Sequence, residues 1–382
     1  MTLHAFSGAA IFDGSNWHHE HILLVADGVV AAIVAPEKVP EGAIPVALDG
    51  GMLVPGFVDL QVNGAGGVLF NEDRSVAGLE TLCAANFQFG TTALLPTLVT
   101  DTVEVTRAAL DAGIAAHRAG VRGFAGLHME GPHLSLARKG AHDPGYIRPM
   151  ETSDLETLIA ARAGLPTLLT TVAVESVTPD QIAALAEAGI IVSIGHSDAT
   201  ADAAATAFAA GASMSTHLFN AMSQLGNREP GLVGATLAGA GWAGLIADGI
   251  HVHPDTIGIA LRAKARPGKI FLVTDAMSPM GTDMTGFTLN GREIVRENGA
   301  LRLADGTLAG ADLTMIDAIR YMHHTVGLDL DEVLRMAALY PAQAIGRADD
   351  LGQLGQGAAA SMVHLSDGLE IGGVWIGGEK VF

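Results

Sequence analysis

Polar side chains that could bind a metal ion or move a proton follow apolar runs in the middle of the chain, at the points where strands would end. A buried strand has no packing reason to end on a carboxylate, an imidazole or an amide. A single histidine at such a position is more often a hydrogen-bonded structural residue, but several such residues together favour a functional site. The residues are Gln61, Glu130, Glu175, His196, His217, Asp248 and Asp275.

Four of these residues could together hydrolyse a polarised carbonyl group. Two imidazoles and a carboxylate, from His196, His217 and Glu130, suit Zn2+ or another borderline divalent cation and leave a position open for water. Such a cation lowers the pKa of its water to about 7, and Asp275 would be the base that accepts the proton. Glu175 and Asp248 are better explained as helix caps or as hydrogen-bond partners of site residues.

The elements that must position these residues alternate between strands and helices. Ala-rich segments of helical periodicity lie between most of the apolar runs, for instance at Thr102–His117, Pro179–Ala188, Ala199–Ala210 and Pro254–Ala265. Eight parallel strands with interleaved helices favour an α/β fold of the (β/α)8 TIM barrel type over a doubly wound sheet, and the strand ends of a barrel converge on one face. The eight runs are Leu53–Gln61, Thr91–Leu98, Gly123–Glu130, Leu168–Glu175, Ile190–His196, Ser213–His217, Gly244–Asp248 and Lys269–Asp275.

Both ends of the chain have short β-like patterns, which predict that they combine into one small domain. We expect this β-sandwich domain to contain residues 1–52 and 346–382, and the barrel to occupy residues 53–345. Within the barrel region, the Asn-Gly turns of Gly286–Asp305 are typical of β-hairpins. Helices at Leu313–His323 and Leu330–Ala344 would then close the barrel.

Composition and charge exclude several classes of partner. The chain has 382 residues, 49% of them hydrophobic, and a formal net charge of −20. These values indicate a large folded core and a field that repels nucleic acid and anionic membranes. The single cysteine, Cys83, excludes an intrachain disulfide and a cysteine-cluster zinc site. The N-terminus lacks a signal-peptide pattern and the Gly-interrupted stretch Pro230–Ala247 is a poor membrane span, so we expect a cytoplasmic protein.

An anionic substrate would need local cations in so acidic a chain. The loop Gly131–His142 after the third strand is rich in cationic side chains, and Arg228 lies in the loop after the sixth strand. A guanidinium group in a loop on the active face of a barrel is suited to an anion. His251, three residues after Asp248, would extend the same face.

The motifs around these residues resemble those of the N-acetylglucosamine-6-phosphate deacetylase family of the amidohydrolase superfamily. The similarity runs over nearly the whole chain. Single pieces occur across the superfamily, but their combination in this order and spacing is specific. The segments that carry the resemblance are Pro55–Gly64, Leu127–Pro132, Lys139–His142, Gly195–Ser197, Thr216–Met222, Arg228–Gly231, Asp248–His251, Val273–Ala276 and Leu308–Gly310.

The resemblance implies a (β/α)8 barrel that removes the acetyl group of N-acetylglucosamine 6-phosphate, giving glucosamine 6-phosphate and acetate. Glu130, His196 and His217 would bind the metal, and Asp275 would be the general base and then the acid towards the leaving amine. In this family the phosphate-binding arginine can come from the neighbouring subunit, so Arg228 implies a homodimer. The substrate contacts implied are Gln61, Ala141, His142, Asn220, Ala221, Arg228, His251, Leu308, Ala309 and Gly310.

One position departs from the wider superfamily, in which a His-x-His pair usually ends the first strand and helps to hold a second metal. Here the same place reads Gln61-Val62-Asn63. Because an amide is a poor ligand beside an imidazole, we expect one tightly bound divalent ion per chain, with Zn2+ as the first candidate and Fe2+ as the second.

Three other functions compete with this one. A deacetylase of N-acetylgalactosamine 6-phosphate would differ only in contacts to one sugar hydroxyl. A sugar-phosphate sensor without catalysis would have no need of Asp275. A hydrolase of another amide, such as an N-acyl amino acid, would have no need of the cationic Lys139–His142 loop and Arg228.

Overall fold

The computed structural model describes residues 2–382, which form two compact units. The first unit contains residues 2–59, Asn86–Ala93 and Met315–Phe382, and the second contains Leu60–Ala85 and Leu94–Thr314. The domain boundaries expected from the sequence stay a prediction: residues 1–52 and 346–382 for the small β domain, and residues 53–345 for the barrel. No helix among residues 2–382 combines the length and the apolar character needed to cross a bilayer.

The barrel is an eight-stranded parallel sheet whose strands follow one another in chain order, which confirms the predicted (β/α)8 fold. The segment after the last strand closes the barrel onto the end of the first strand, because the Asp275 amide donates to the Gln61 carbonyl at 2.9 Å and the Asn63 amide donates to the Ala276 carbonyl at 2.8 Å. Its strands are β8 (Phe57–Val62), β11 (Thr91–Val99), β12 (Leu127–Glu130), β13 (Leu168–Val172), β14 (Ile191–Ile194), β15 (Met214–Ser215), β16 (Trp242–Leu245) and β17 (Ile270–Leu272).

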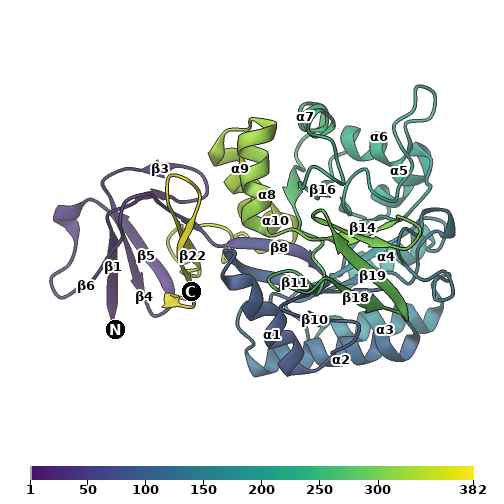
Figure 1. The fold of residues 1–382 in the computed structure, drawn as a ribbon, viewed down its shortest axis with the longest axis horizontal. Coiled ribbons are helices and arrows are strands. Elements are labelled where there is room, and N and C mark those ends of the chain that lie inside the picture. The colour runs from purple at the N-terminus through teal and green to yellow at the C-terminus, as the bar shows by residue number, and fades with distance from the viewer. Residues whose placement is uncertain (1) are drawn as a thin grey trace. The chain divides into compact units, whose positions relative to one another are not determined.

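A helix follows each of the first seven barrel strands, and Figure 1 shows these helices on the outside of the strands. Their starts carry the expected local signals: Thr102, Thr178 and Thr200 each accept a backbone hydrogen bond as N-caps. The helices are α1 (Val76–Phe87), α2 (Val103–Ala119), α3 (Thr152–Arg162), α4 (Pro179–Glu187), α5 (Ala201–Ala209), α6 (Gly231–Ala238) and α7 (Pro254–Ala263).

The predicted hairpin insert is a four-stranded antiparallel sheet, which follows the last barrel strand in the sequence and precedes the C-terminal helices. One face of it packs on barrel residues through Leu289, Ile294 and Leu301. Its strands are β18 (Gly286–Leu289), β19 (Arg292–Glu297), β20 (Ala300–Leu303) and β21 (Leu308–Ala311), and the short hairpin of β9 (Gly64–Ala65) and β10 (Val68–Leu69) lies earlier in the chain.

The first unit is built from both chain ends, as predicted. β7 (Met52–Pro55) pairs antiparallel with β22 (Met362–Leu365), and a shared core joins residues such as Phe6, Leu53 and Trp375. One sheet contains β5 (Val29–Val34), β4 (Ile22–Ala26), β1 (Leu3–Ser7) and β6 (Ile44–Ala47). The other contains β24 (Glu379–Lys380), β23 (Ile371–Ile376), β22, β7, β2 (Ala10–Phe12) and β3 (Trp17–His18).

The same unit contains the helices α8 (Met315–Tyr321), α9 (Leu330–Ala337) and α10 (Leu339–Ala344), which the sequence placed at the closure of the barrel. The predicted run Leu53–Gln61 was wrong as one strand, because the chain breaks at Gly56 into β7 and β8. A Cβ at Gly56 would lie 2.0 Å from the Thr92 hydroxyl, so only glycine fits there.

Candidate active site

Four of the predicted site residues lie where barrel strands end. Glu130 is the last residue of β12, His196 and His217 follow β14 and β15 by two residues, and Asp275 follows β17 by three. The last three residues have positive φ angles of 48°, 25° and 53°. Residues other than glycine rarely adopt this backbone conformation, and such strain persists chiefly at functional sites. The strand ends therefore turn these side chains sharply inward.

The side chains of Glu130, His196 and His217 bring three ligand atoms together. The Nε2 atoms of the two histidines lie 3.1 Å apart, and they lie 3.3 and 3.1 Å from the same Glu130 oxygen, Oε1. With ligand bonds of about 2.0–2.1 Å, the edges of a zinc tetrahedron are about 3.3–3.4 Å long. The triangle formed by these three atoms therefore fits one face of a tetrahedral metal site.

Hydrogen bonds around His196 favour this use of its Nε2 atom. Its Nδ1 lies 2.9 Å from the carbonyl oxygen of Arg138, which can only accept, so Nδ1 carries the proton and Nε2 has a free lone pair. Although burial opposes charge on Glu130, the imidazoles of His196 and His217 beside its oxygens hold the pKa of this carboxyl well below its usual range. The carboxylate is therefore ionised, as a metal ligand must be.

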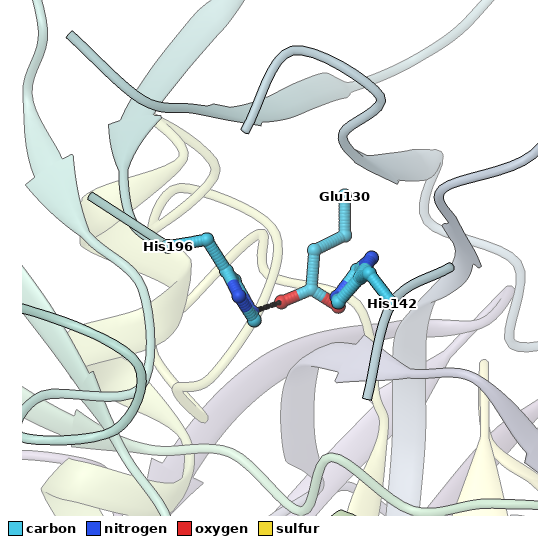
Figure 2. Close-up of side chains that lie close together, drawn as sticks. All are labelled: Glu130, His142 and His196. Atoms are coloured by element: carbon cyan, nitrogen blue, oxygen red, sulfur yellow. Dashed lines mark ion pairs between the residues drawn. The ribbon is translucent and has the colours of Figure 1, made fainter. Parts of the chain in front are cut away.

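His142 is the third imidazole near this carboxylate, and Figure 2 shows the rings of His142 and His196 on either side of Glu130. Its Nε2 lies 3.9 Å from Glu130 Oε2, and the ligand atoms of His142, His196 and Glu130 all fall within 4.8 Å of one another. The Thr100 amide donates to His142 Nδ1 at 3.3 Å, so the proton of the neutral ring is on Nε2. Burial, together with the nearby His196, lowers the pKa of His142 to about 3, so the ring is neutral. Its Nε2–H is a donor that points into the pocket.

Asp275 is held by two amide side chains. Its Oδ1 accepts from Asn63 Nδ2 at 2.7 Å and from Gln61 Nε2 at 3.2 Å, and Gln61 Nε2 also donates to Glu130 Oε1 at 2.9 Å. The Gln61 amide thus bridges the two carboxylates. Burial and the neighbouring Glu130 charge raise the pKa of Asp275 to about 6. A carboxyl with such a pKa can take and return a proton near neutral pH.

Other buried groups near the site are neutral or serve as partners. Burial lowers the pKa of His128, two residues before Glu130, to about 4. Glu175 accepts from the Ser197 hydroxyl at 2.7 Å and the Asp198 amide at 2.6 Å, and Asp248 lies 2.6 Å from His251 Nδ1. Both acidic residues therefore have partner roles of the kind the sequence suggested.

Glu130, His142, His196, His217 and Asp275 line a pocket of about 340 Å³. Among its lining residues Arg138 is the only lysine or arginine, and its guanidinium group is paired with Asp198 at 2.7 Å. Of the predicted substrate contacts, Gln61 and Ala309 are buried beside the pocket rather than in its wall, and Arg228 is exposed outside it. Those in the wall are Ala141, His142, Asn220, Ala221, His251, Leu308 and Gly310.

The sequence did not single out several residues of the wall. Leu289 and Asn290 come from β18 and the turn after it, Thr307 precedes β21, and Ala137 and Arg138 belong to the loop after β12. Only the hairpin turns and the basic character of the loop hinted at them, because their role depends on how the insert packs on the barrel.

The comparisons with known proteins agree with this arrangement. The family model for the amidohydrolase family matches residues 52–381. The chain belongs to the amidohydrolase family. An N-acetylgalactosamine-6-phosphate deacetylase of Shewanella sp. (strain ANA-3) is 42% identical to this member over 98% of the chain and 95% of the relative. An N-acetylglucosamine-6-phosphate deacetylase of Haemophilus influenzae is 34% identical over 98% of each.

Solved structures give the same picture of this amidohydrolase. The crystal structure of N-acetylglucosamine-6-phosphate deacetylase from Pasteurella multocida superposes with a TM-score of 0.95 at 37% identity, over 99% of both chains. A mutant N-acetyl-D-glucosamine-6-phosphate deacetylase from Mycobacterium smegmatis, solved in complex with N-acetyl-D-glucosamine-6-phosphate, has a TM-score of 0.89 at 30% identity. The family resemblance predicted from the sequence and the predicted (β/α)8 fold are both confirmed.

Proposed function

We propose that this amidohydrolase removes the N-acetyl group of N-acetylglucosamine 6-phosphate and releases acetate and glucosamine 6-phosphate. The observation that carries the proposal is the convergence of Glu130, His196 and His217 beside Asp275 at one end of the barrel, in a pocket whose wall also contains a neutral imidazole donor. Relatives at 34–42% identity over nearly the whole chain carry names of deacetylases of amino-sugar phosphates, which supports the substrate class.

The proposed mechanism assigns one task to each group. A single divalent ion, Zn2+ or else Fe2+, held by Glu130, His196 and His217, would polarise the amide carbonyl and make water acidic enough to be deprotonated. Asp275 accepts the proton as the water oxygen bonds to the carbonyl carbon. It then returns that proton to the nitrogen as the C–N bond breaks, so that the amine and acetate leave. His142 donates its Nε2–H to the carbonyl oxygen as negative charge develops there.

One ion rather than two is favoured by the amides at the end of the first barrel strand. Gln61 donates to both Glu130 and Asp275, and Asn63 donates to Asp275. Amide hydrogens thus supply the positive charge between the two carboxylates that a second cation would otherwise supply.

The phosphate is proposed to meet Arg228 of a neighbouring subunit in a homodimer. The wall of the pocket offers Arg138 alone among lysines and arginines, and Asp198 already neutralises it. Arg228 belongs to an exposed run at residues 224–230, in which Leu225 is 58% exposed. A guanidinium group on such a loop can reach a second copy and bind a phosphate there. We also propose a cytoplasmic location, where a phosphorylated sugar would be available.

A second candidate substrate is N-acetylgalactosamine 6-phosphate, because the relative at 42% identity is named for that sugar. The two sugars differ at one hydroxyl, and the same metal site and base would serve both. A sensor without catalysis is disfavoured by the presence of Asp275, which binding alone does not require.

Acetate release from three compounds, measured side by side, tests the proposal. The compounds are N-acetylglucosamine 6-phosphate, N-acetylgalactosamine 6-phosphate and unphosphorylated N-acetylglucosamine, each with metal-loaded and chelator-treated protein. We expect fast, metal-dependent release from the first. Faster release from the second would make N-acetylgalactosamine 6-phosphate the preferred substrate. Binding of these compounds without acetate release from any of them would favour the sensor.

A further inference from the structure

A chain of buried hydrogen bonds crosses the inside of the barrel next to the proposed metal ligands. The Ser193 and Thr216 hydroxyls lie 2.6 Å apart, and the Thr216 and Thr171 hydroxyls also lie 2.6 Å apart. Thr171 Oγ1 is 2.7 Å from His128 Nε2, and His128 Nδ1 is 3.0 Å from the Leu60 carbonyl oxygen. We call these five residues the hydroxyl–imidazole chain. Its four side chains are at most 4% exposed.

Only one arrangement of protons satisfies this chain. The Leu60 carbonyl can only accept, so the single N–H of the neutral His128 ring is on Nδ1, and Nε2 must accept from the Thr171 hydroxyl. Thr171 has then used its hydrogen, so its oxygen accepts from Thr216, whose oxygen in turn accepts from Ser193. Each link therefore fixes the orientation of the next.

Every member is tied to a strand that positions the site. His128 and Glu130 lie two residues apart in β12, so their side chains point to the same face. Thr216 directly precedes His217, whose φ is 25°. Thr171 pairs in register with Glu130, and its carbonyl accepts from the Gly131 amide at 3.1 Å. The chain thus links these strands through their side chains, in addition to their backbone ladders.

The sequence makes room for these contacts at Gly195, directly before His196. A Cβ there would lie 2.8 Å from Thr216 Cβ and 2.9 Å from Thr171 Cγ2. Both distances are shorter than atoms tolerate, so a larger residue would push the two threonines apart. A glycine at this position lets their hydroxyls meet.

We propose that the hydroxyl–imidazole chain is a positioning network that fixes the strand ends bearing Glu130, His196 and His217 and thereby sets the affinity for the metal. The inference rests on the metal site of the proposed function. Removal of one hydroxyl leaves a buried polar partner unsatisfied. The strand ends then relax, and the strained backbone at His217 loses part of what holds it.

The test is the metal dissociation constant of the full-length protein, measured by competition between metal-free protein and a chelator of known affinity for Zn2+. The variants are Thr216→Val, Thr171→Val, the double variant and Thr216→Ser, which keeps the hydroxyl. The matched control is Thr236→Val. Thr236 Oγ1 in α6 also makes a buried bond of 2.7 Å, to the Ser215 hydroxyl of β15. Successive residues of a strand face opposite sides, so this bond lies on the outer face of β15.

Each single valine variant of the chain should weaken metal binding by about 10- to 100-fold, the range typical of residues that support a ligand. The double variant should weaken binding by less than the product of the two single effects, because both single variants already remove the same Thr171–Thr216 bond. The metal affinity of Thr216→Ser should stay within about threefold of the wild type. The affinity of Thr236→Val should also stay within about threefold, even if its melting temperature falls as much as that of the chain variants.

Unchanged affinity in Thr216→Val and Thr171→Val, or an equal loss in the Thr236→Val control, would overturn the inference. Failure of Thr216→Ser to restore affinity would do the same. If the wild type itself binds no divalent metal, the proposed function fails rather than the network. Wild-type binding with no difference among the variants refutes the network alone.

Discussion

Replacement of Asp275 by asparagine should separate catalysis from stability, because this carboxyl is costly to ionise in the folded protein. Its pKa rises to about 6 through burial and the charge of Glu130, whereas an unfolded chain releases the same proton near pH 3.8. Above about pH 6 both states are ionised, and the folded state is then less favourable by about 3 kcal/mol. Below about pH 4 both states hold the proton and this term vanishes.

The metal-free Asp275→Asn protein should therefore melt at a higher temperature than metal-free wild type at pH 7.5, and the difference should shrink towards pH 4. The Asn oxygen can still accept from Asn63 and Gln61, so the local bonds are retained. Turnover with metal bound should fall by about 10²- to 10⁴-fold, since a general base contributes that much. This loss equals about 3–5 kcal/mol in the activation barrier.

The assays are acetate release by metal-loaded protein and thermal unfolding of metal-free protein at several pH values. Asp101→Asn is the matched control, because Asp101 is also a buried carboxylate but accepts from Asn71 at 2.8 Å outside the pocket wall. Its turnover should stay within a few-fold of wild type. Asp275→Asn turnover within tenfold of wild type, at equal metal content, would refute the role of Asp275 as the base.

Three further substitutions probe the phosphate contact, the base and the packing. Arg228→Ala should raise KM for the phosphorylated sugar far more than for unphosphorylated N-acetylglucosamine, and an equal effect on both would remove Arg228 from the phosphate site. Asn63→Leu removes the 2.7 Å bond that favours the charged form of Asp275, so the pKa of Asp275 should rise. The acid limb of the pH profile of kcat should then move to higher pH, and an unmoved limb would contradict this role of Asn63. Gly195→Ala should destabilise the protein by about 1–3 kcal/mol in denaturant unfolding, because the added Cβ would lie 2.8 Å from Thr216 Cβ; an unchanged midpoint would show that the threonines can shift freely.

The barrel and the convergence of its strand ends could be predicted from the sequence because both follow from local patterns. Apolar runs and helical periodicities mark the strands and helices, and in a barrel all strand ends meet on one face. Glu130, His196, His217 and Asp275 were therefore placed correctly at one end, although nothing local in the sequence shows that three of them have positive φ.

What the sequence could not supply depends on contacts between distant segments. The break at Gly56 follows from the approach of Thr92, and the pocket wall at Asn290 and Thr307 follows from the packing of the insert. The hydroxyl–imidazole chain joins β8, β12, β13, β14 and the end of β15 through single hydroxyls. Threonines and serines inside apolar strands have no sequence signal that distinguishes such partners from isolated ones.

A titration of metal-free protein with Zn2+, monitored by the rate of acetate release from N-acetylglucosamine 6-phosphate, would decide whether this fold works as a single-metal deacetylase. The geometry of Glu130, His196 and His217, with Gln61 between the two carboxylates, predicts a rate that rises linearly and saturates at one ion per chain. Saturation at two ions per chain, or acetate release that does not depend on added metal, would contradict it.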